Sequence, residues 1–303
     1  MLYNWNNSET IPWLIRISLC LFALLIGSLT DLRKREVPDF VNYGLIFAGV
    51  GINLLFSIIY SDYWYILSSI LGLAIFFCVA WAMFYTGQWG GGDSKMLMGL
   101  GATMGINISF SAPFFSVHQF LLYFLFNVLV FGALYGLLWS IFKSIQFRKK
   151  FAKEWKRTQT AMKIGKLKIY LLALVILGFG SFVFINDISM RILMLSFMFV
   201  MTSTFYIWIF IRTVEKTSML KFVKPTSLTE GDWIVKDIYV QKKYVCGPKD
   251  LGISKSQIRK LVRFYRQGKI KNVLIKEGIP FVPSFFFAFL ATLLVGHPLV
   301  WIF

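Results

Sequence analysis

Eight apolar stretches, each close to 20 residues long, constrain the fold of this chain more than any other feature. They lie at about 11–30, 40–60, 64–86, 94–112, 117–142, 169–186, 188–211 and 281–303. A helix needs about 20 apolar residues to cross the hydrocarbon core of a bilayer. Since 57% of the chain is hydrophobic and only 15% is charged, the sequence predicts an all-α polytopic membrane protein with about eight transmembrane helices.

Basic residues fall unevenly between these stretches. If the N-terminus is outside, the inside carries Lys/Arg at 33–35, at Lys95, at ten positions in 143–168 and at sixteen in 212–276, and the outside only Arg16 and Arg191. Lys and Arg concentrate in cytoplasmic loops, although a segment as long as 212–280 does not count toward this rule. Without this segment, fourteen Lys and Arg residues remain inside against two outside. We therefore expect both termini outside. This bias accounts for most of the net charge of +18.

The stretches and the segments between them divide the chain into five parts. We expect a membrane core of about five helices at 1–142, a basic cytoplasmic loop at 143–168, a helical hairpin at 169–211, a small cytoplasmic domain at 212–280 and a last transmembrane helix at 281–303.

The segment 212–280 has the pattern of a small α+β insert. Residues 233–235 and 238–240 are typical of a strand pair, and 272–275 of a closing strand. Ser254 and Gln257 have capping-box spacing before a helix that Gly268 ends. Sixteen basic residues against six acidic ones leave ten net positive charges, which we expect to contact anionic lipid headgroups. No groove-reading motif or aromatic platform is evident, so no nucleic-acid partner is expected.

Two aspartates stand at the edges of apolar stretches. Asp93 follows Gly90, Gly91 and Gly92 at the start of the fourth stretch, and Asp31 closes the first. A carboxylate beside hydrocarbon is costly and is usually retained where something uses it. Both aspartates are predicted to lie on the cytoplasmic side, so they meet if the first and fourth helices are neighbours.

Each aspartate alone also has a purely structural interpretation. Asp31 is explained by a salt bridge to the basic residues 33–35, and Asp93 by an N-cap of the fourth helix. Together they favour a catalytic interpretation, because two carboxylates in one site do not both ionise easily. One can then deprotonate a water while the other hydrogen-bonds a scissile carbonyl, which is aspartic peptidase chemistry and needs no metal or cofactor. The glycines would let a substrate approach the backbone and let Asp93 move into line.

A resemblance to known families supports the catalytic interpretation. The run from Gly90 to Asp93 resembles the GxGD motif of intramembrane aspartic proteases. The run from Asp31 to Asp39, with its basic patch and Val37-Pro38, resembles the first-aspartate region of type IV prepilin peptidases. The segments 95–102 and 277–283 are also similar to that family, and most of all to its archaeal branch, which includes preflagellin (archaellin) peptidases.

The resemblance implies roles for particular residues. Asp31 and Asp93 would be the catalytic pair, with Gly90 and Gly92 as the motif glycines and Gly91 at the variable position. The enzyme would cut a short basic leader, the class III signal peptide, from archaeal prepilins or preflagellins at the cytoplasmic membrane face. Because they are close to Asp31 in sequence, Glu36 and Asp39 are candidates for binding that leader. No nucleotide fingerprint is present, so we expect a peptidase without N-methyltransferase activity.

Two alternatives remain open. An ion-coupled transporter or channel could use Asp31 and Asp93 as ion ligands, although the expected membrane cores carry almost no other charge. A presenilin-like or signal-peptide-peptidase-like protease would place its first aspartate deeper in a helix. In this chain Asp31 stands at a helix end before Arg33.

The cysteines and histidines give no metal-binding pattern. Cys20, Cys78 and Cys246 lie far apart and form no CxxC pair, so we interpret them as small packing residues. His118 and His297 are isolated near expected helix ends and are interpreted as interfacial or packing residues.

Overall fold

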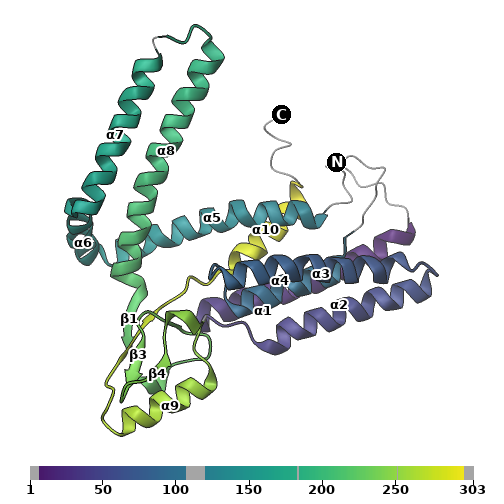
Figure 1. Cartoon of the computed structure of the whole chain (residues 1–303). Helices are drawn as coiled ribbons and strands as arrows, with labels where there is room; N and C mark the ends of the chain where they lie inside the picture. Colours follow the sequence, from purple (N-terminus) through teal and green to yellow (C-terminus); the bar gives the residue numbers. More distant parts are fainter. Residues whose placement is uncertain (1–6, 107–119, 183, 251, 297–303) are drawn as a thin grey trace.

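The structure, a computed structural model, describes residues 7–106, 120–182, 184–250 and 252–296. It is mostly helical, with a short strand-containing region near the C-terminus (Figure 1). The helices are α1 (Asn7–Lys34), α2 (Asp39–Ile59), α3 (Trp64–Tyr85), α4 (Gly91–Met104), α5 (Phe120–Gln146), α6 (Arg148–Thr160), α7 (Met162–Phe182), α8 (Ile188–Val214), α9 (Lys255–Arg266) and α10 (Val282–Leu294). The prediction of a polytopic helical membrane protein is confirmed.

Within the described residues, six helices are long and apolar enough to cross a membrane: α1, α2, α3, α5, α7 and α8, the last running on to Met219. The other two expected spans are shorter helices, because α4 has 14 residues and α10 has 13. Both expected spans extend into 107–119 and 297–303, which lie outside the described residues, as do His118 and His297.

Helices α1 to α5 and α10 pack into one bundle around a common apolar core. Its most deeply buried members include Leu24, Phe76, Leu100, Phe124 and Phe285. Helix α4 is enclosed by α1, α2 and α3, and α10 lies between α1 and α5. Since α1 and α4 are neighbours, the condition for Asp31 and Asp93 to meet is fulfilled.

Small residues allow α4 to approach its neighbours closely. Gly72 of α3 and Gly101 of α4 face each other so tightly that a Cβ on either would collide with the other's carbonyl oxygen. Small residues at helix contacts allow this close packing in membrane proteins. At the far end of α4, Arg16 of α1 donates a hydrogen bond to the Met104 carbonyl at 3.2 Å, where a positive charge suits a helix C-terminus.

A helical hairpin of α7 and α8 leans away from the bundle, with Asp187 capping α8 at its tip (Figure 1). The basic segment before it, expected as a loop, contains the helix α6. Phe151 and Trp155 stack one turn apart on α6, and Phe151 packs on Phe210 of α8. This apolar contact, together with the helix-forming Lys and Arg residues, explains why the segment is helical.

The strand region, residues 215–277, follows α8. It begins with a short π-helix, η1 (Glu215–Met219), and contains two 3₁₀ helices, η2 (Pro225–Ser227) and η3 (Pro248–Asp250). Its strands are β1 (Leu220–Val223), β2 (Trp233–Ile234), β3 (Ile238–Val240), β4 (Lys243–Cys246) and β5 (Val273–Lys276), and α9 lies between β4 and β5. The first sheet is antiparallel in the order β1-β5-β2, and β3 pairs with β4 in a second. The expected pairing of 233–235 with 238–240 is therefore wrong: each of these strands has another partner.

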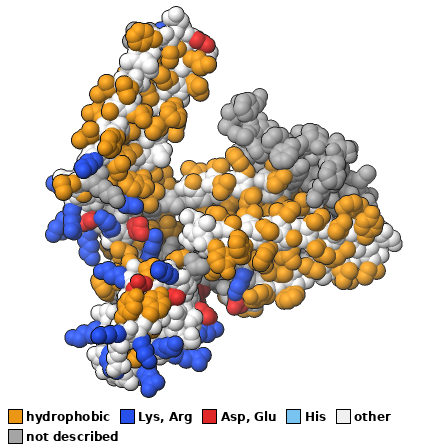
Figure 2. All heavy atoms as spheres, viewed as in Figure 1, with side chains coloured by type: hydrophobic (Ala, Val, Ile, Leu, Met, Phe, Trp, Pro, Cys, Tyr) orange, Lys and Arg blue, Asp and Glu red, His pale blue; other side chains and the backbone are white. Residues whose placement is uncertain are grey.

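The expected helix of the strand region is confirmed. Ser254 and Gln257 form the capping box at the start of α9, and Gly268, with φ of +73°, follows its end. Figure 2 shows Lys and Arg side chains gathered over the strand region and the base of the hairpin, whereas apolar side chains cover the bundle and the hairpin itself.

Candidate active site

Asp31 lies in the last turn of α1 and is only 5% exposed. Its Oδ2 accepts a hydrogen bond from the backbone amide of Val282 at 3.0 Å. Val282 is the first residue of α10, whose N-terminal amides carry a partial positive charge. The carboxylate of Asp31 therefore lies at the N-terminus of α10.

Asp93 lies in the first turn of α4 and is partly buried. Its Oδ2 accepts a hydrogen bond from the backbone amide of Gly90 at 3.0 Å. Gly90 is the N-cap of α4, so the structural interpretation of Asp93 as an N-cap is wrong. Asp93 is the third helical residue and instead satisfies the amide of the N-cap.

The structure brings the two carboxylates to the same end of the bundle. Asp31 lies in the last turn of α1, Asp93 lies in the first turn of α4, and these two helices pack together. Two acidic groups in a mainly apolar bundle, each with a backbone amide on one oxygen, are suited to hold and exchange a proton.

The motif glycines have ordinary backbone angles. Gly90 has φ of −74°, Gly91 and Gly92 are the first residues of α4, and none of them has positive φ. A Cβ on Gly91 would meet only Phe84, at 3.9 Å, and a Cβ on Gly92 would meet Val37 at ordinary contact distances from 3.5 Å. Neither backbone angle nor space requires glycine in this conformation, so a requirement for glycine would come from substrate or movement.

Comparison with known proteins covers the part of the bundle that holds both aspartates. Residues 18–137 match the model of the type IV leader peptidase family. This part of the chain is similar to that family.

Three curated relatives, all preflagellin peptidases, match parts of the chain. That of Methanocaldococcus jannaschii is 41% identical over 80 residues, and that of Methanococcus maripaludis 42% over 80, in each case 26% of this chain and 34% of the relative. That of Methanococcus voltae is 33% identical over 106 residues, 35% of this chain and 44% of the relative. The chain thus spans less than half the length of the curated relatives it matches. No solved structure matches.

Glu36 and Asp39, the candidates for leader binding, differ in their surroundings. Asp39 Oδ1 forms an ion pair with Lys95 Nζ at 2.6 Å, and Lys95 also lies over the ring of Tyr43, 4.9 Å from its centre. Glu36 is exposed and has no ion pair within the described residues. Of the two, only Glu36 has a charge that no basic side chain of the described chain neutralises.

Sequence reasoning missed two groups that lie near Asp31. One is the amide of Val282, which any residue except proline supplies and which therefore leaves no sequence signal. The other is Tyr135 of α5, whose hydroxyl is buried without a hydrogen-bond partner in the described structure and interacts electrostatically with Asp31. A buried, unsatisfied hydroxyl in a native fold needs an explanation, and a catalytic role is one of those that apply.

The described residues contain no cluster of three or more His, Cys, Asp or Glu side chains that could hold a metal ion. Cys20 and Cys246 are fully buried and Cys78 is exposed on α3, all as free thiols. Burial, with the charge of Asp250, raises the pKa of Cys246 to about 11, so this thiol stays protonated and unreactive near neutral pH.

Proposed function

We propose that this chain is a membrane-embedded aspartic endopeptidase that removes the short basic leader from archaeal prepilins or preflagellins. The observation that carries the proposal is the placement of Asp31 and Asp93 at the same end of two packed helices, where the Oδ2 of each accepts a hydrogen bond from a backbone amide. The names of the preflagellin peptidase relatives support the choice of substrate.

The pair would act as acid and base together. The ionised carboxylate takes a proton from a water, the resulting hydroxide attacks the scissile carbonyl, and the protonated carboxyl donates a hydrogen bond to the carbonyl oxygen. The amide of the leaving segment then receives a proton from the pair. These steps use only this chain's residues and a water, and we expect no methylation of the new N-terminus.

We further propose that the aspartates face the cytoplasm. Lys and Arg gather over the strand region and the base of the hairpin, and the strand region lies at the end of the bundle where α1 ends (Figures 1 and 2). Cytoplasmic segments are the ones enriched in basic residues. A precursor with its leader in the cytoplasm and its apolar helix in the membrane would present the junction of these two parts at the level of the two aspartates.

Replacement of Asp31 or Asp93 by Asn tests the proposal. Membranes containing each variant and an archaeal preflagellin should process the precursor about 1,000-fold more slowly than wild type, or not at all, because acid–base catalysis typically contributes 10²–10⁴-fold. Asp62→Asn, in the turn between α2 and α3, is the matched control and should cleave normally. Wild-type processing by either active-site variant would exclude the pair as the catalytic groups.

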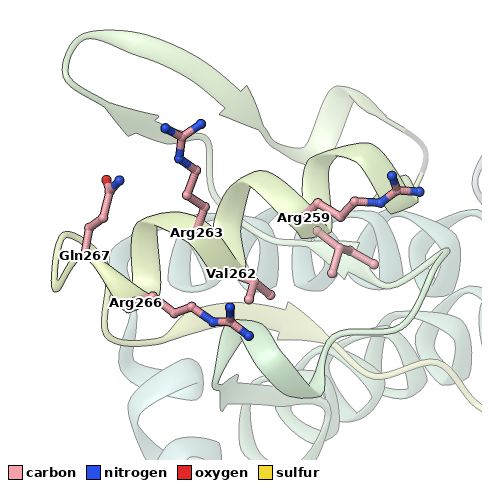
Figure 3. Close-up of a pocket in the computed structure, with 6 residues that line it drawn as sticks. Arg259, Val262, Arg263, Arg266 and Gln267 are labelled. Atoms are coloured by element: carbon pink, nitrogen blue, oxygen red, sulfur yellow. The ribbon is translucent and has the colours of Figure 1, made fainter.

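We propose anionic lipid headgroups as a second partner, through one face of α9. Arg259, Arg263 and Arg266 project from this helix beside Val262 (Figure 3) and line an open depression of about 510 Å³. Guanidinium groups bind phosphate, and the aliphatic side chain between them suits the acyl boundary. Native mass spectrometry of the full chain should detect fewer retained anionic lipids when the three arginines become Gln. The control, Lys242→Gln/Lys243→Gln in the β3–β4 hairpin, should retain the wild-type number.

A further inference from the structure

The strand region is connected to the Asp31 side of the site by a short linker. Strand β5 is the middle strand of its sheet and ends at Lys276, and α10 begins at Val282. Only residues 277–281 separate the sheet from the amide that holds Asp31. The sheet and the amide donor of Asp31 are therefore only a few residues apart in the chain.

Glu277 fixes the start of this linker. Its amide donates to the Met219 carbonyl at 2.8 Å, and its carboxylate pairs with Lys221 Nζ at 2.6 Å and with Arg35. Arg35 directly follows α1, four residues after Asp31. Burial, together with the positive charges of Arg35 and Lys143, lowers the pKa of Lys221. Glu277 is thus the shared anion of a basic cluster that joins the sheet to the end of α1.

The same sheet reaches the Asp93 side through Trp233. Trp233 lies on β2, opposite Lys276 of β5. Its indole covers Gly87, where an added Cβ would lie 3.1 Å from Cη2 and 3.6 Å from Cζ3. Gly87 has φ of +69°, so both its backbone angle and the indole favour glycine there.

Gly87 begins the loop that presents Asp93. The amides of Gln88 and Trp89 return to the Met83 carbonyl at 2.9 and 3.2 Å, and the loop then runs to Gly90, the N-cap that holds Asp93. Trp89 is buried, and its ring centre lies 5.9 Å from that of Phe281, the residue before Val282. The loop and the linker therefore contact each other through the residues that precede the two donors, Gly90 and Val282.

We propose that the strand region is a positioning element that sets both catalytic carboxylates, with Trp233 acting on the Asp93 loop and Glu277 on the Asp31 donor. The proposal rests on the peptidase function proposed above. Its distinguishing feature is that one sheet contacts both halves of the site, through neighbouring strands. A region that only anchored the chain to lipid would not need either contact.

A kinetic experiment on the full-length protein tests the positioning role. Trp233→Ala and Glu277→Gln should each lower kcat about 10- to 100-fold and leave KM within about two-fold, since small misplacements of reacting groups cost rates of this order. Trp233→Phe keeps an aromatic ring on β2 but lacks the outer indole atoms that lie over Gly87, so it should restore only part of the rate. The matched controls are Tyr239→Ala, an exposed aromatic on β3, and Glu230→Gln, a surface partner of Lys255. Both should cleave normally.

A second measurement does not depend on cleavage. In Trp233→Ala, hydrogen exchange of the amides at 87–93 should become about ten-fold faster, because the loop loses its cover, and exchange in the middle of α2 should stay unchanged. The two readouts separate the two proposals. If the wild-type chain cleaves no precursor but loop exchange responds to Trp233→Ala, the peptidase function fails and the positioning of the loop stands.

The positioning role is overturned if the wild type cleaves, Asp93→Asn is inactive, and Trp233→Ala and Glu277→Gln keep both the wild-type kcat and wild-type loop exchange. It is also overturned if their lost activity matches only the lost fraction of folded protein.

Discussion

The two aspartates are held in the same way by parts of the chain at very different distances. Asp93 accepts its hydrogen bond from Gly90, three residues away, and Asp31 accepts from Val282, 251 residues away. Both lie at a helix N-terminus, where amide dipoles favour a carboxylate. For Asp93 that helix is its own helix, α4, and for Asp31 it is α10.

This difference separates local from global control of the site. The family-matched residues 18–137 include both aspartates and Gly90 but not Val282. The Asp93 half can be built from a short motif, whereas the Asp31 half is complete only after the C-terminal helix has docked. Variants that remove one donor at a time should therefore give different combinations of lost activity and lost stability.

The largest combined effect is expected from Val282→Pro, which removes the donor to Asp31. A hydrogen bond to a charged group contributes about 1.5–3 kcal/mol, so the free energy of unfolding should fall by about that amount and processing should fall with it. Val282→Ala is the control, because it removes buried side-chain atoms but keeps the amide. Thermal unfolding in detergent and a precursor assay measure both quantities. Equal losses in the two variants would show that the hydrogen bond contributes nothing.

A smaller and purely local effect is expected from Gly90→Pro, which removes the donor to Asp93. The φ of −74° at Gly90 already suits a proline ring. We expect cleavage to fall about ten-fold, as for a loosened catalytic group, with little change in thermal stability. Gly91→Ala keeps the Gly90 amide and should retain activity. If Gly90→Pro destabilised the protein as much as Val282→Pro, the contrast between local and distant anchoring would be wrong.

The features that could be predicted from the sequence are those encoded locally. The long apolar runs predicted the helices, and the spacing of Ser254 and Gln257 predicted the start of α9. The motif around Asp93 also lies within one short segment. In each case the side chains that determine the structure are neighbours in the sequence, so their spacing can be read directly.

The features that were missed depend on backbone groups or on distant contacts. The β3–β4 hairpin turns at Gln241 and Lys242, which have φ of +53° and +64° and replace the Asn-Gly expected in such a turn. The Val282 donor has no side-chain signature. Trp233 gave a strand signal, but nothing in its local sequence indicates that its indole covers Gly87.

An intermediate effect is expected from Tyr135→Phe, which removes the unpaired hydroxyl on the Asp31 side. If this hydroxyl donates to substrate or water, kcat should fall about three- to ten-fold, since one neutral hydrogen bond contributes about 0.5–1.5 kcal/mol. Stability should stay level or rise, because an unsatisfied polar group leaves the interior. Tyr170→Phe, at an exposed position of α7, is the control. Unchanged kcat with raised stability would mean that the hydroxyl has no role in the reaction.

The smallest effect is expected at the two acidic residues after Asp31. Glu36→Gln should raise KM for a basic leader about two- to five-fold, because an exposed charge contributes up to about 1 kcal/mol. Asp39→Asn should leave KM unchanged, since Lys95 already neutralises Asp39. A precursor whose leader Lys and Arg residues are replaced by Gln should remove the difference between Glu36→Gln and wild type. If Asp39→Asn raised KM more than Glu36→Gln did, the leader would have to displace Lys95 and pair with Asp39 instead.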